Sequence, residues 1–165
     1  MIKYFVMDVD GTLTDGKIYM GADGEFVKAF DIKDGCGIHD LLIPSGIVPV
    51  IITGRTSQIV RNRCRELGIT ALYQGISNKK EKLEEILREN GDSCLNVAYI
   101  GDDINDLECM QEVLLNGGVV GCPPGCCRGS KKYCIICQQQ RWGCRSCQRF
   151  YRMGVEEVRV EWMVI

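Results

Sequence analysis

The sequence has no long apolar run. Across its 165 residues, no stretch approaches the ~18–20 apolar residues that a membrane-spanning helix needs. The first ten residues mix charged side chains into an apolar run and show no cleavage site, which argues against a signal peptide. A net charge of −2 provides no bulk attraction to nucleic acid or to an anionic membrane. We therefore expect a cytoplasmic protein with neither as a partner.

Acidic residues are absent from one region, residues 113–155, which holds most of the cysteines. Seven of the 11 cysteines lie within residues 122–147, and seven Lys or Arg lie within residues 128–152. The preceding part has ordinary composition and is long enough to bury the core of a domain without disulfides. We therefore divide the chain into a core, residues 1–121, and a cysteine-rich basic tail, residues 122–165.

Two hydrophobic patterns alternate along the core. Short apolar runs predict strands at 4–7, 47–52, 70–73, 97–100 and 119–121, and helical spacing predicts helices at 34–42, 56–67, 77–90 and 105–115. A β-hairpin is expected at 17–30. This alternation predicts an α/β fold, a doubly wound parallel sheet with helices on both faces. Ligand sites in such sheets lie beyond the carboxyl ends of the strands, which is where the polar clusters of this sequence fall.

Two acids, Asp8 and Asp10, follow the first predicted strand. Side chains two residues apart on a strand share a face, so both carboxylates can enter one cleft. Two such charges need a proton or a cation beside them, and Mg²⁺ suits oxygen ligands. Gly11 permits a tight turn around an anion. The same residues also make an ordinary turn, so this motif alone leaves catalysis open.

Three further polar clusters follow later strands. Thr53 ends a strand, where its hydroxyl could bind a phosphoryl oxygen or cap the next helix. Lys79 lies near a helix start, as a phosphate-binding cation or as a solvated lysine. Asp102 and Asp103 open an acidic turn, as metal ligands or as acids that favour a helix N-terminus. Each cluster has an ordinary structural explanation when it is taken alone.

Taken together and in this order, the four clusters resemble the haloacid dehalogenase superfamily over residues 1–121. The core further resembles a capless branch, the 3-deoxy-D-manno-octulosonate 8-phosphate phosphatases, in the segments DVDGTLTDG, KAFDIKDG, IITGR, LYQGISNK and VAYIGDDIND. Sister enzymes that act on nonulosonate 9-phosphates share most of this framework, but Arg55 matches the eight-carbon branch better. The resemblance implies a haloacid dehalogenase-like Rossmannoid fold with a protruding hairpin and no cap domain. It also implies Mg²⁺ as cofactor and a place in lipopolysaccharide biosynthesis.

The resemblance implies a role for each matched residue. Asp8 attacks phosphorus to give an aspartyl phosphate, and Asp10 acts as general acid and then general base. The implied site residues are catalytic Asp8 and Asp10; metal-binding Asp8, Asp10 through its backbone carbonyl, Asp102 and Asp103; phosphate-binding Thr53, Gly54 and Lys79; and substrate-binding Asp31, Lys33, Asp34, Gly35, Arg55 and Arg63. His39, the only histidine, is expected at the surface or the rim of the site. The resemblance also implies a homotetramer, with the hairpins joined at its centre and a neighbour's tail closing each site.

The tail departs from this family and admits three interpretations. Cys134 and Cys137 followed by Cys144 and Cys147 resemble a zinc site, although the six residues between the pairs are few for a zinc ribbon. A zinc site would go with an alternative function, a non-catalytic relic core that carries a zinc-binding tail, although the intact set of Asp8, Asp10, Thr53, Lys79 and Asp102 argues against a relic. A basic nucleic-acid arm with aromatic stacking groups (Trp142, Phe150 and Tyr151) is a second interpretation.

A frameshift is the third interpretation of the tail. Codons allowed for residues 125–132 give Asp-Ala-Ala-Glu-Glu-Ala-Lys when the first G is dropped. In the same shifted frame, residues 138–143 give Ser-Ser-Lys-Gly-Gly and residues 148–154 give Arg-Asp-Phe-Thr-Glu-Trp. These are elements that relatives carry after the last predicted strand, in the same order. Degenerate codons left freedom in this choice, so the frameshift stays a hypothesis that the coding DNA tests.

Overall fold

The computed structural model describes residues 1–123, 125–129 and 136–137. The zinc and nucleic-acid interpretations of the tail rest mainly on residues outside these ranges: Cys134, Cys144, Cys147, Trp142, Phe150 and Tyr151. The frameshifted segments likewise lie largely outside them. Among the described residues, no helix is long and apolar enough to cross a membrane.

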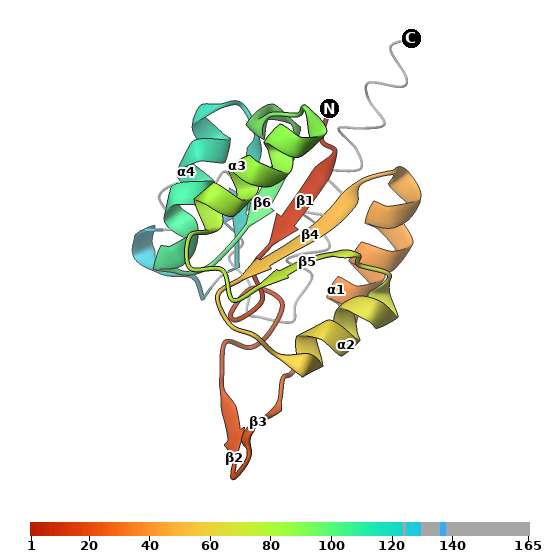
Figure 1. Cartoon of the computed structure of the whole chain (residues 1–165), viewed down its shortest axis with the longest axis vertical. Coiled ribbons are helices and arrows are strands. Elements are labelled where there is room, and N and C mark those ends of the chain that lie inside the picture. Colours follow the sequence, from red (N-terminus) through yellow and green to blue (C-terminus); the bar gives the residue numbers. More distant parts are fainter. Residues whose placement is uncertain (124, 130–135, 138–165) are drawn as a thin grey trace.

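A six-stranded sheet with parallel pairing organises the chain (Figure 1). Its strand order is β5-β4-β1-β6-β7-β8. The strands are β1 (Tyr4–Met7), β4 (Val48–Thr53), β5 (Ala71–Gln74), β6 (Val97–Ile100), β7 (Val119–Cys122) and β8 (Ile136–Cys137). The first five strands were predicted to within two residues, whereas β8, on residues of the tail, was not predicted. The α/β doubly wound fold is therefore confirmed.

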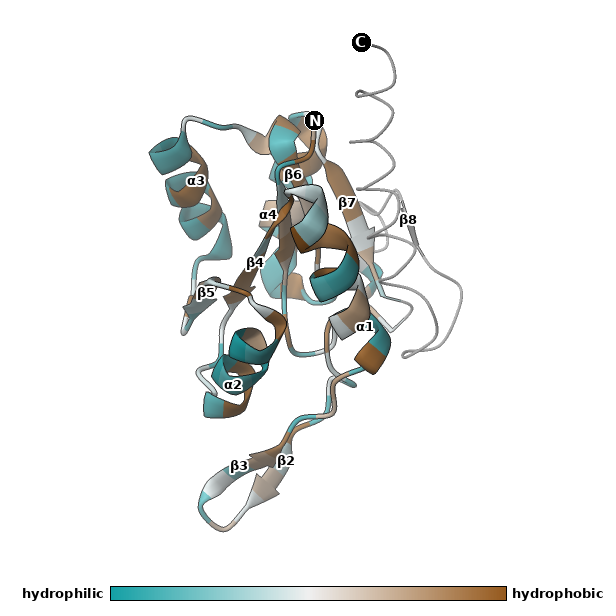
Figure 2. Ribbon diagram, turned by 90° about the vertical axis from the view of Figure 1, so that its right-hand side faces the viewer, coloured by the Kyte–Doolittle hydropathy of each residue, from teal (hydrophilic) through white to brown (hydrophobic). Residues whose placement is uncertain are grey.

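Helices cover both faces of the sheet (Figure 2), and each face has its own apolar core. Ile38 and Leu42, with α2 (Gln58–Leu67), pack against one face. The other face is covered by α3 (Lys79–Asn90) and α4 (Leu107–Leu115). Strands buried on both faces read as continuous apolar runs, and β1 and β6 are buried throughout.

The four predicted helix starts each differ from the observed starts by two residues, and the first and third helices show why. The first helix, α1 (Ile32–Cys36), begins before Asp34 because Asp31 is its N-cap and accepts a hydrogen bond from the Lys33 amide at 2.8 Å. It continues as a π-helical turn (Gly37–Leu42) and a 3-10 turn (Ile43–Ser45). The third helix starts at Lys79, with Asn78 rather than Ser77 as its cap. Short polar side chains cluster near the start of both helices, so each of the two segments contains more than one possible N-cap residue.

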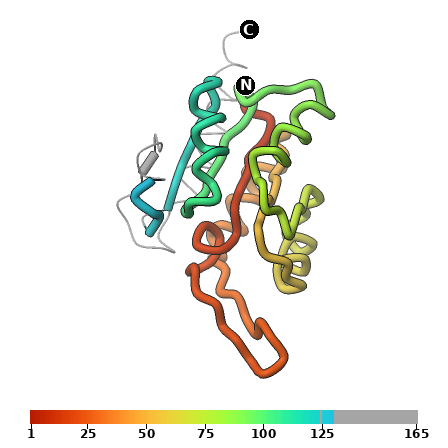
Figure 3. Tube along the Cα trace, turned by 60° about the vertical axis from the view of Figure 1, so that its left-hand side comes forward, coloured from red at the N-terminus to blue at the C-terminus, as the bar shows by residue number. Residues whose placement is uncertain are grey.

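A hairpin extends from the carboxyl side of the sheet, between β1 and α1 (Figure 3). It pairs β2 (Tyr19–Gly21) with β3 (Gly24–Val27) in antiparallel fashion. The predicted hairpin is confirmed, with strands shorter than expected. Several of its apolar side chains are exposed, namely Ile18, Tyr19, Met20, Phe26 and Val27. A two-stranded ribbon of this kind is marginally stable alone.

Two leucines that differ in burial provide a matched test of the core. Leu42 is 0% exposed and Leu115 is 75% exposed. We expect Leu42→Ala to lower the free energy of unfolding by about 2–5 kcal/mol because it leaves a cavity. Leu115→Ala should change it by no more than about 0.5 kcal/mol. Urea unfolding followed by circular dichroism measures both, and equal losses would contradict this packing.

Candidate active site

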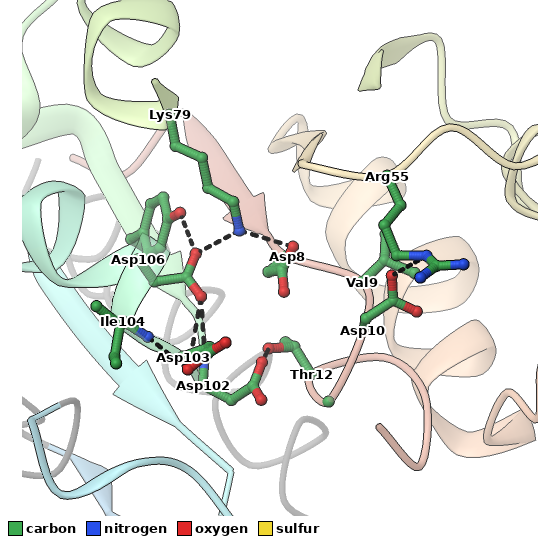
Figure 4. Close-up of polar contacts among 12 residues, drawn as sticks. Asp8, Val9, Asp10, Thr12, Arg55, Lys79, Asp102, Asp103, Ile104 and Asp106 are labelled. Atoms are coloured by element: carbon green, nitrogen blue, oxygen red, sulfur yellow. Dashed lines mark hydrogen bonds and ion pairs between the residues drawn. The ribbon is translucent and has the colours of Figure 1, made fainter. Parts of the chain in front are cut away.

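A buried lysine joins two acids at the carboxyl edge of the sheet (Figure 4). Asp8 follows β1 directly, and Lys79 is the first residue of α3. The Lys79 Nζ atom lies 2.8 Å from Asp8 Oδ1 and 2.8 Å from Asp106 Oδ1. All three residues are buried, and a charge is stable there only when it is paired. The lysine is therefore fixed beside Asp8 and is not a solvated surface residue.

Asp106 holds this arrangement in place, and the sequence analysis did not assign it a role. Its Oδ1 atom also accepts a hydrogen bond from the Tyr99 hydroxyl at 2.7 Å. Its Oδ2 atom accepts from the backbone amides of Asp102 at 3.2 Å and Asp103 at 3.3 Å. Asp106 thus positions both Lys79 and the acidic loop. The sequence did offer one signal for this role: Asp106 lies in the first turn of a predicted helix, where an acid can accept hydrogen bonds from preceding amides.

A close approach between two loops places Asp102 opposite Asp8. Gly11 has φ of 95°, and a Cβ built on it would lie 2.0 Å from Asp102 Oδ2. Glycine is therefore required there for both its backbone conformation and its lack of a side chain. The Thr12 hydroxyl donates to Asp102 Oδ1 at 2.9 Å. The turn after β1 thereby sets the position of the Asp102 carboxylate.

Three carboxylates converge at this edge of the sheet. Asp8, Asp102 and Asp106 each offer an oxygen within 4.8 Å of the other two. Asp106 is engaged by Lys79 and two amides, which leaves Asp8 and Asp102 as the better placed ligands. The Asp103 carboxylate instead accepts a hydrogen bond from the Ile104 amide at 2.7 Å and caps a 3-10 turn. The metal-binding role expected of Asp103 stays a prediction.

Mutual repulsion and burial perturb these acids. Burial raises the pKa of Asp8 to about 6, the Asp106 carboxylate adds to the rise and Lys79 opposes it. Burial and the Asp8 carboxylate raise the pKa of Asp102 to about 7, against the hydrogen bond from Thr12. For Lys79, burial acts to lower the pKa, but Asp8 and Asp106 outweigh it and the pKa is raised. The cluster thus carries more negative charge than Lys79 alone compensates.

Asp10 points away from this cluster, toward a second set of charges (Figure 4). Its Oδ2 atom lies 3.8 Å from Arg55 Nε, and its Oδ1 atom pairs with the Lys28 ammonium. Lys28 also lies 2.9 Å from Glu25 Oε1, which in turn lies 3.5 Å from Arg55 Nη2. The sequence analysis named Asp10 and Arg55 but missed Glu25 and Lys28. Both belong to the segment predicted as a hairpin, residues 17–30, and the sequence pattern of that segment did not indicate a buried charge.

The expected phosphate-binding residues lie at the end of β4. Thr53 is the last residue of that strand and is buried, and Gly54 follows it at the surface. The Thr53 carbonyl accepts a hydrogen bond from the Ile76 amide at 3.1 Å. This bond ties the end of β4 to the segment that leads to Lys79. Thr53 and Lys79 therefore reach the same edge of the sheet from neighbouring elements.

The expected substrate contacts other than Arg55 gather around α1. The residues at its start are Asp31, Lys33, Asp34 and Gly35. The Arg63 guanidinium lies 5.9 Å from the centre of the Phe30 ring and so close to Gly35 that a Cβ there would lie 2.4 Å from Arg63 Nη2. Arg63 therefore packs beside this helix start. His39 is exposed, as expected, and its Nδ1 atom lies 2.8 Å from Asp40 Oδ1.

Known proteins resemble this chain in sequence and in architecture. No protein-family model matches the chain. The 3-deoxy-D-manno-octulosonate 8-phosphate phosphatase of Escherichia coli K12 is 46% identical over 123 residues, which are 74% of this chain and 65% of the relative. The chain thus spans just under two thirds of the curated relatives it matches.

Solved structures agree over a longer span. The 3-deoxy-D-manno-octulosonate 8-phosphate phosphatase of Moraxella catarrhalis, crystallised with magnesium ion, phosphate ion and KDO, superposes with a TM-score of 0.85. It is 34% identical, over 94% of this chain and 86% of that one. A HAD superfamily (subfamily III A) hydrolase from Legionella pneumophila superposes with a TM-score of 0.83 at 27% identity, over 97% and 85% of the two chains. The chain therefore belongs to the 3-deoxy-D-manno-octulosonate 8-phosphate phosphatase family of the haloacid dehalogenase superfamily.

Proposed function

We propose that this chain is a phosphatase that hydrolyses 3-deoxy-D-manno-octulosonate 8-phosphate to the free sugar acid and phosphate. The observation that carries the proposal is Asp8, buried at the end of β1 with Lys79 Nζ 2.8 Å away and Asp102 opposite. The Moraxella relative with the same architecture binds magnesium, phosphate and KDO. A cytoplasmic step in lipopolysaccharide biosynthesis is part of the same proposal.

The acids at the site suit Mg²⁺. Burial raises the pKa values of Asp8 and Asp102, and a neighbouring carboxylate adds to each rise, Asp106 for Asp8 and Asp8 for Asp102. A divalent cation among these acids would offset that repulsion. Their hard carboxylate oxygens are the ligands that Mg²⁺ prefers. Asp8, Asp102 and the Asp10 backbone carbonyl would hold the ion, with Asp103 in support. Bound there, Mg²⁺ would neutralise charge between the nucleophile and the phosphate.

The side chains of the chain perform the two displacements. An Asp8 carboxylate oxygen attacks phosphorus in line with the bond to the sugar oxygen. That bond breaks, Asp10 gives its proton to the departing sugar oxygen, and an aspartyl phosphate remains. Asp10 then takes a proton from water, which attacks phosphorus and releases phosphate and Asp8. Lys79 and Thr53 would bind the other phosphoryl oxygens, with Gly54 beside them.

The substrate's carboxylate requires cations outside the phosphate pocket. Arg55 is partly exposed beside Asp10, and Arg63 packs beside the start of α1. We propose that these two arginines, with Asp31, Lys33, Asp34 and Gly35, contact the sugar acid. A planar guanidinium suits a carboxylate because it can donate two parallel hydrogen bonds.

We also propose the assembly and the origin of the tail. Exposed apolar side chains on the hairpin favour joining of copies into a homotetramer through that ribbon. The 123 residues matched in the Escherichia coli relative are close in number to the core, residues 1–121. This supports a division at about residue 122, and we propose a shifted reading frame as the origin of the tail.

The nucleophile is tested by Asp8→Asn. We expect Mg²⁺-dependent phosphate release from 3-deoxy-D-manno-octulosonate 8-phosphate to fall on the order of 10³-fold or more, because the amide cannot attack phosphorus. Asp92→Asn is the matched control, since Asp92 pairs with Lys3 near the opposite end of β1. A nonulosonate 9-phosphate is the comparison substrate, and faster turnover of it would overturn the eight-carbon assignment. Retained activity in Asp8→Asn would overturn the mechanism.

Removing Mg²⁺ should make stability depend on pH. The folded pKa values of Asp8 (about 6) and Asp102 (about 7) lie above the ordinary value. The stability that their protonation contributes is therefore lost as pH rises through 6 to 7. Mg²⁺ binds the ionised forms, so its increase in Tm should be larger at about pH 8 than at about pH 5. Differential scanning fluorimetry measures this, Asp102→Asn should weaken the trend, and an equal effect of Mg²⁺ at both pH values would contradict it.

The frameshift has a direct test in the coding DNA. An extra G near the codons for residues 124 and 125 is expected, and its absence would refute the hypothesis. A chain with the frame corrected should assemble into a tetramer by light scattering, because a neighbour's tail then completes each site. It should also bind the sugar acid more tightly than the present chain.

A further inference from the structure

Lys28, the residue after β3 of the hairpin, is buried but is not part of the phosphate site. Lys28 is 6% exposed, and its ammonium pairs with Asp10 Oδ1 and lies 2.9 Å from Glu25 Oε1. A buried ammonium loses its hydration and persists only when it is paired. An apolar side chain would fill the same place at lower cost if packing were its whole purpose.

Glu25 anchors this lysine to the body of the protein. Its Oε2 atom accepts a hydrogen bond from the Ser57 hydroxyl at 2.5 Å, and its Oε1 atom lies 3.5 Å from Arg55 Nη2. Ser57 is itself buried, and its amide donates to Gln74 Oε1 at 2.7 Å. The hairpin is thereby joined to the loop after β4 and to the start of α2. Lys28 consequently has little freedom to move.

The Asp10 carboxylate lies between the two cations of this network. Lys28 meets Oδ1 and Arg55 Nε lies 3.8 Å from Oδ2. The carboxylate therefore turns away from Lys79, which engages Asp8 on the other side (Figure 4). The network of Asp10, Glu25, Lys28 and Arg55 contains two carboxylates and two cations, so its charges balance while Asp10 is ionised. Loss of Lys28 would leave Asp10 with one distant cation, Arg55, and Glu25 without its closest cation.

We propose that Lys28, held by Glu25, is a positioning residue that keeps the Asp10 side chain directed at the leaving-group oxygen. The inference deepens the proposed function and rests on it. Lys28 transfers no proton itself. Asp10 gives its proton to the sugar oxygen while the Asp8–phosphorus bond forms and the phosphorus–sugar oxygen bond breaks. Lys28 acts by holding the Asp10 carboxyl group in position while the phosphorus–sugar oxygen bond breaks.

A leaving group that needs no proton separates this role from a structural one. Sugar alkoxide leaves poorly unless it is protonated, whereas p-nitrophenolate leaves unassisted. We would measure leaving-group release in single turnovers, with enzyme in excess, from 3-deoxy-D-manno-octulosonate 8-phosphate and from p-nitrophenyl phosphate. Lys28→Met should slow release of the sugar by about 10- to 100-fold and release of p-nitrophenolate by less than about threefold, because only the first requires a positioned acid.

Two further variants complete the experiment. Lys17→Met, at an exposed lysine before the hairpin, should leave both rates unchanged. Glu25→Gln keeps the size of the side chain and removes the charge that holds Lys28. It should therefore also slow release of the sugar more than release of p-nitrophenolate, and it replaces Lys28→Met as the test if that variant does not fold. Equal slowing of both substrates would overturn the positioning role while leaving the proposed function intact. No release of either leaving group by the unsubstituted chain would overturn both.

Discussion

The pairing of Lys79 with Asp8 and Asp106 is the interaction on which the rest of the site depends. Each of these residues is buried, and each would be unstable there as a lone charge. Because Asp106 also accepts from Tyr99 and from two loop amides, one carboxylate fixes β6, the acidic loop and the start of α3 together. Asp8 is then oriented by elements from three parts of the sequence, all at the carboxyl edge of one sheet.

Asp8 and Asp10 are two residues apart, yet they belong to different electrostatic environments. Asp8 faces Lys79 and Asp102, where excess negative charge favours a metal ion. Asp10 faces Lys28 and Arg55, where the charges balance. One strand end thus supplies two carboxylates that can perform different tasks, attack on phosphorus and proton transfer, because different elements surround each of them. The hairpin is part of that division, since it carries Lys28 and Glu25.

The sequence predicted the sheet, the hairpin and the residues at the strand ends because these depend on local patterns. Apolar runs of three to six residues marked the strands of the core, and the order of the motifs indicated that Asp8, Thr53, Lys79 and Asp102 meet at one edge. Helix starts were less certain because neighbouring polar residues compete as caps, as Asp31 and Asp34 do. Asp106 and Lys28 were missed for another reason. Their importance comes from long-range pairing in a buried place, and a charged residue in a sequence does not show whether it will be buried.

Two backbone hydrogen bonds lie at the boundary that we propose between the core and the tail. The Cys127 amide donates to the Asp102 carbonyl at 2.8 Å, and the Cys126 amide donates to the Pro123 carbonyl at 3.1 Å. Both bonds use backbone groups, so almost any residue can make them. A shifted frame changes side chains and leaves such bonds available. The contacts that hold Asp102 from within the core (Thr12, Gly11 and Asp106) lie upstream of the junction and are encoded independently of it.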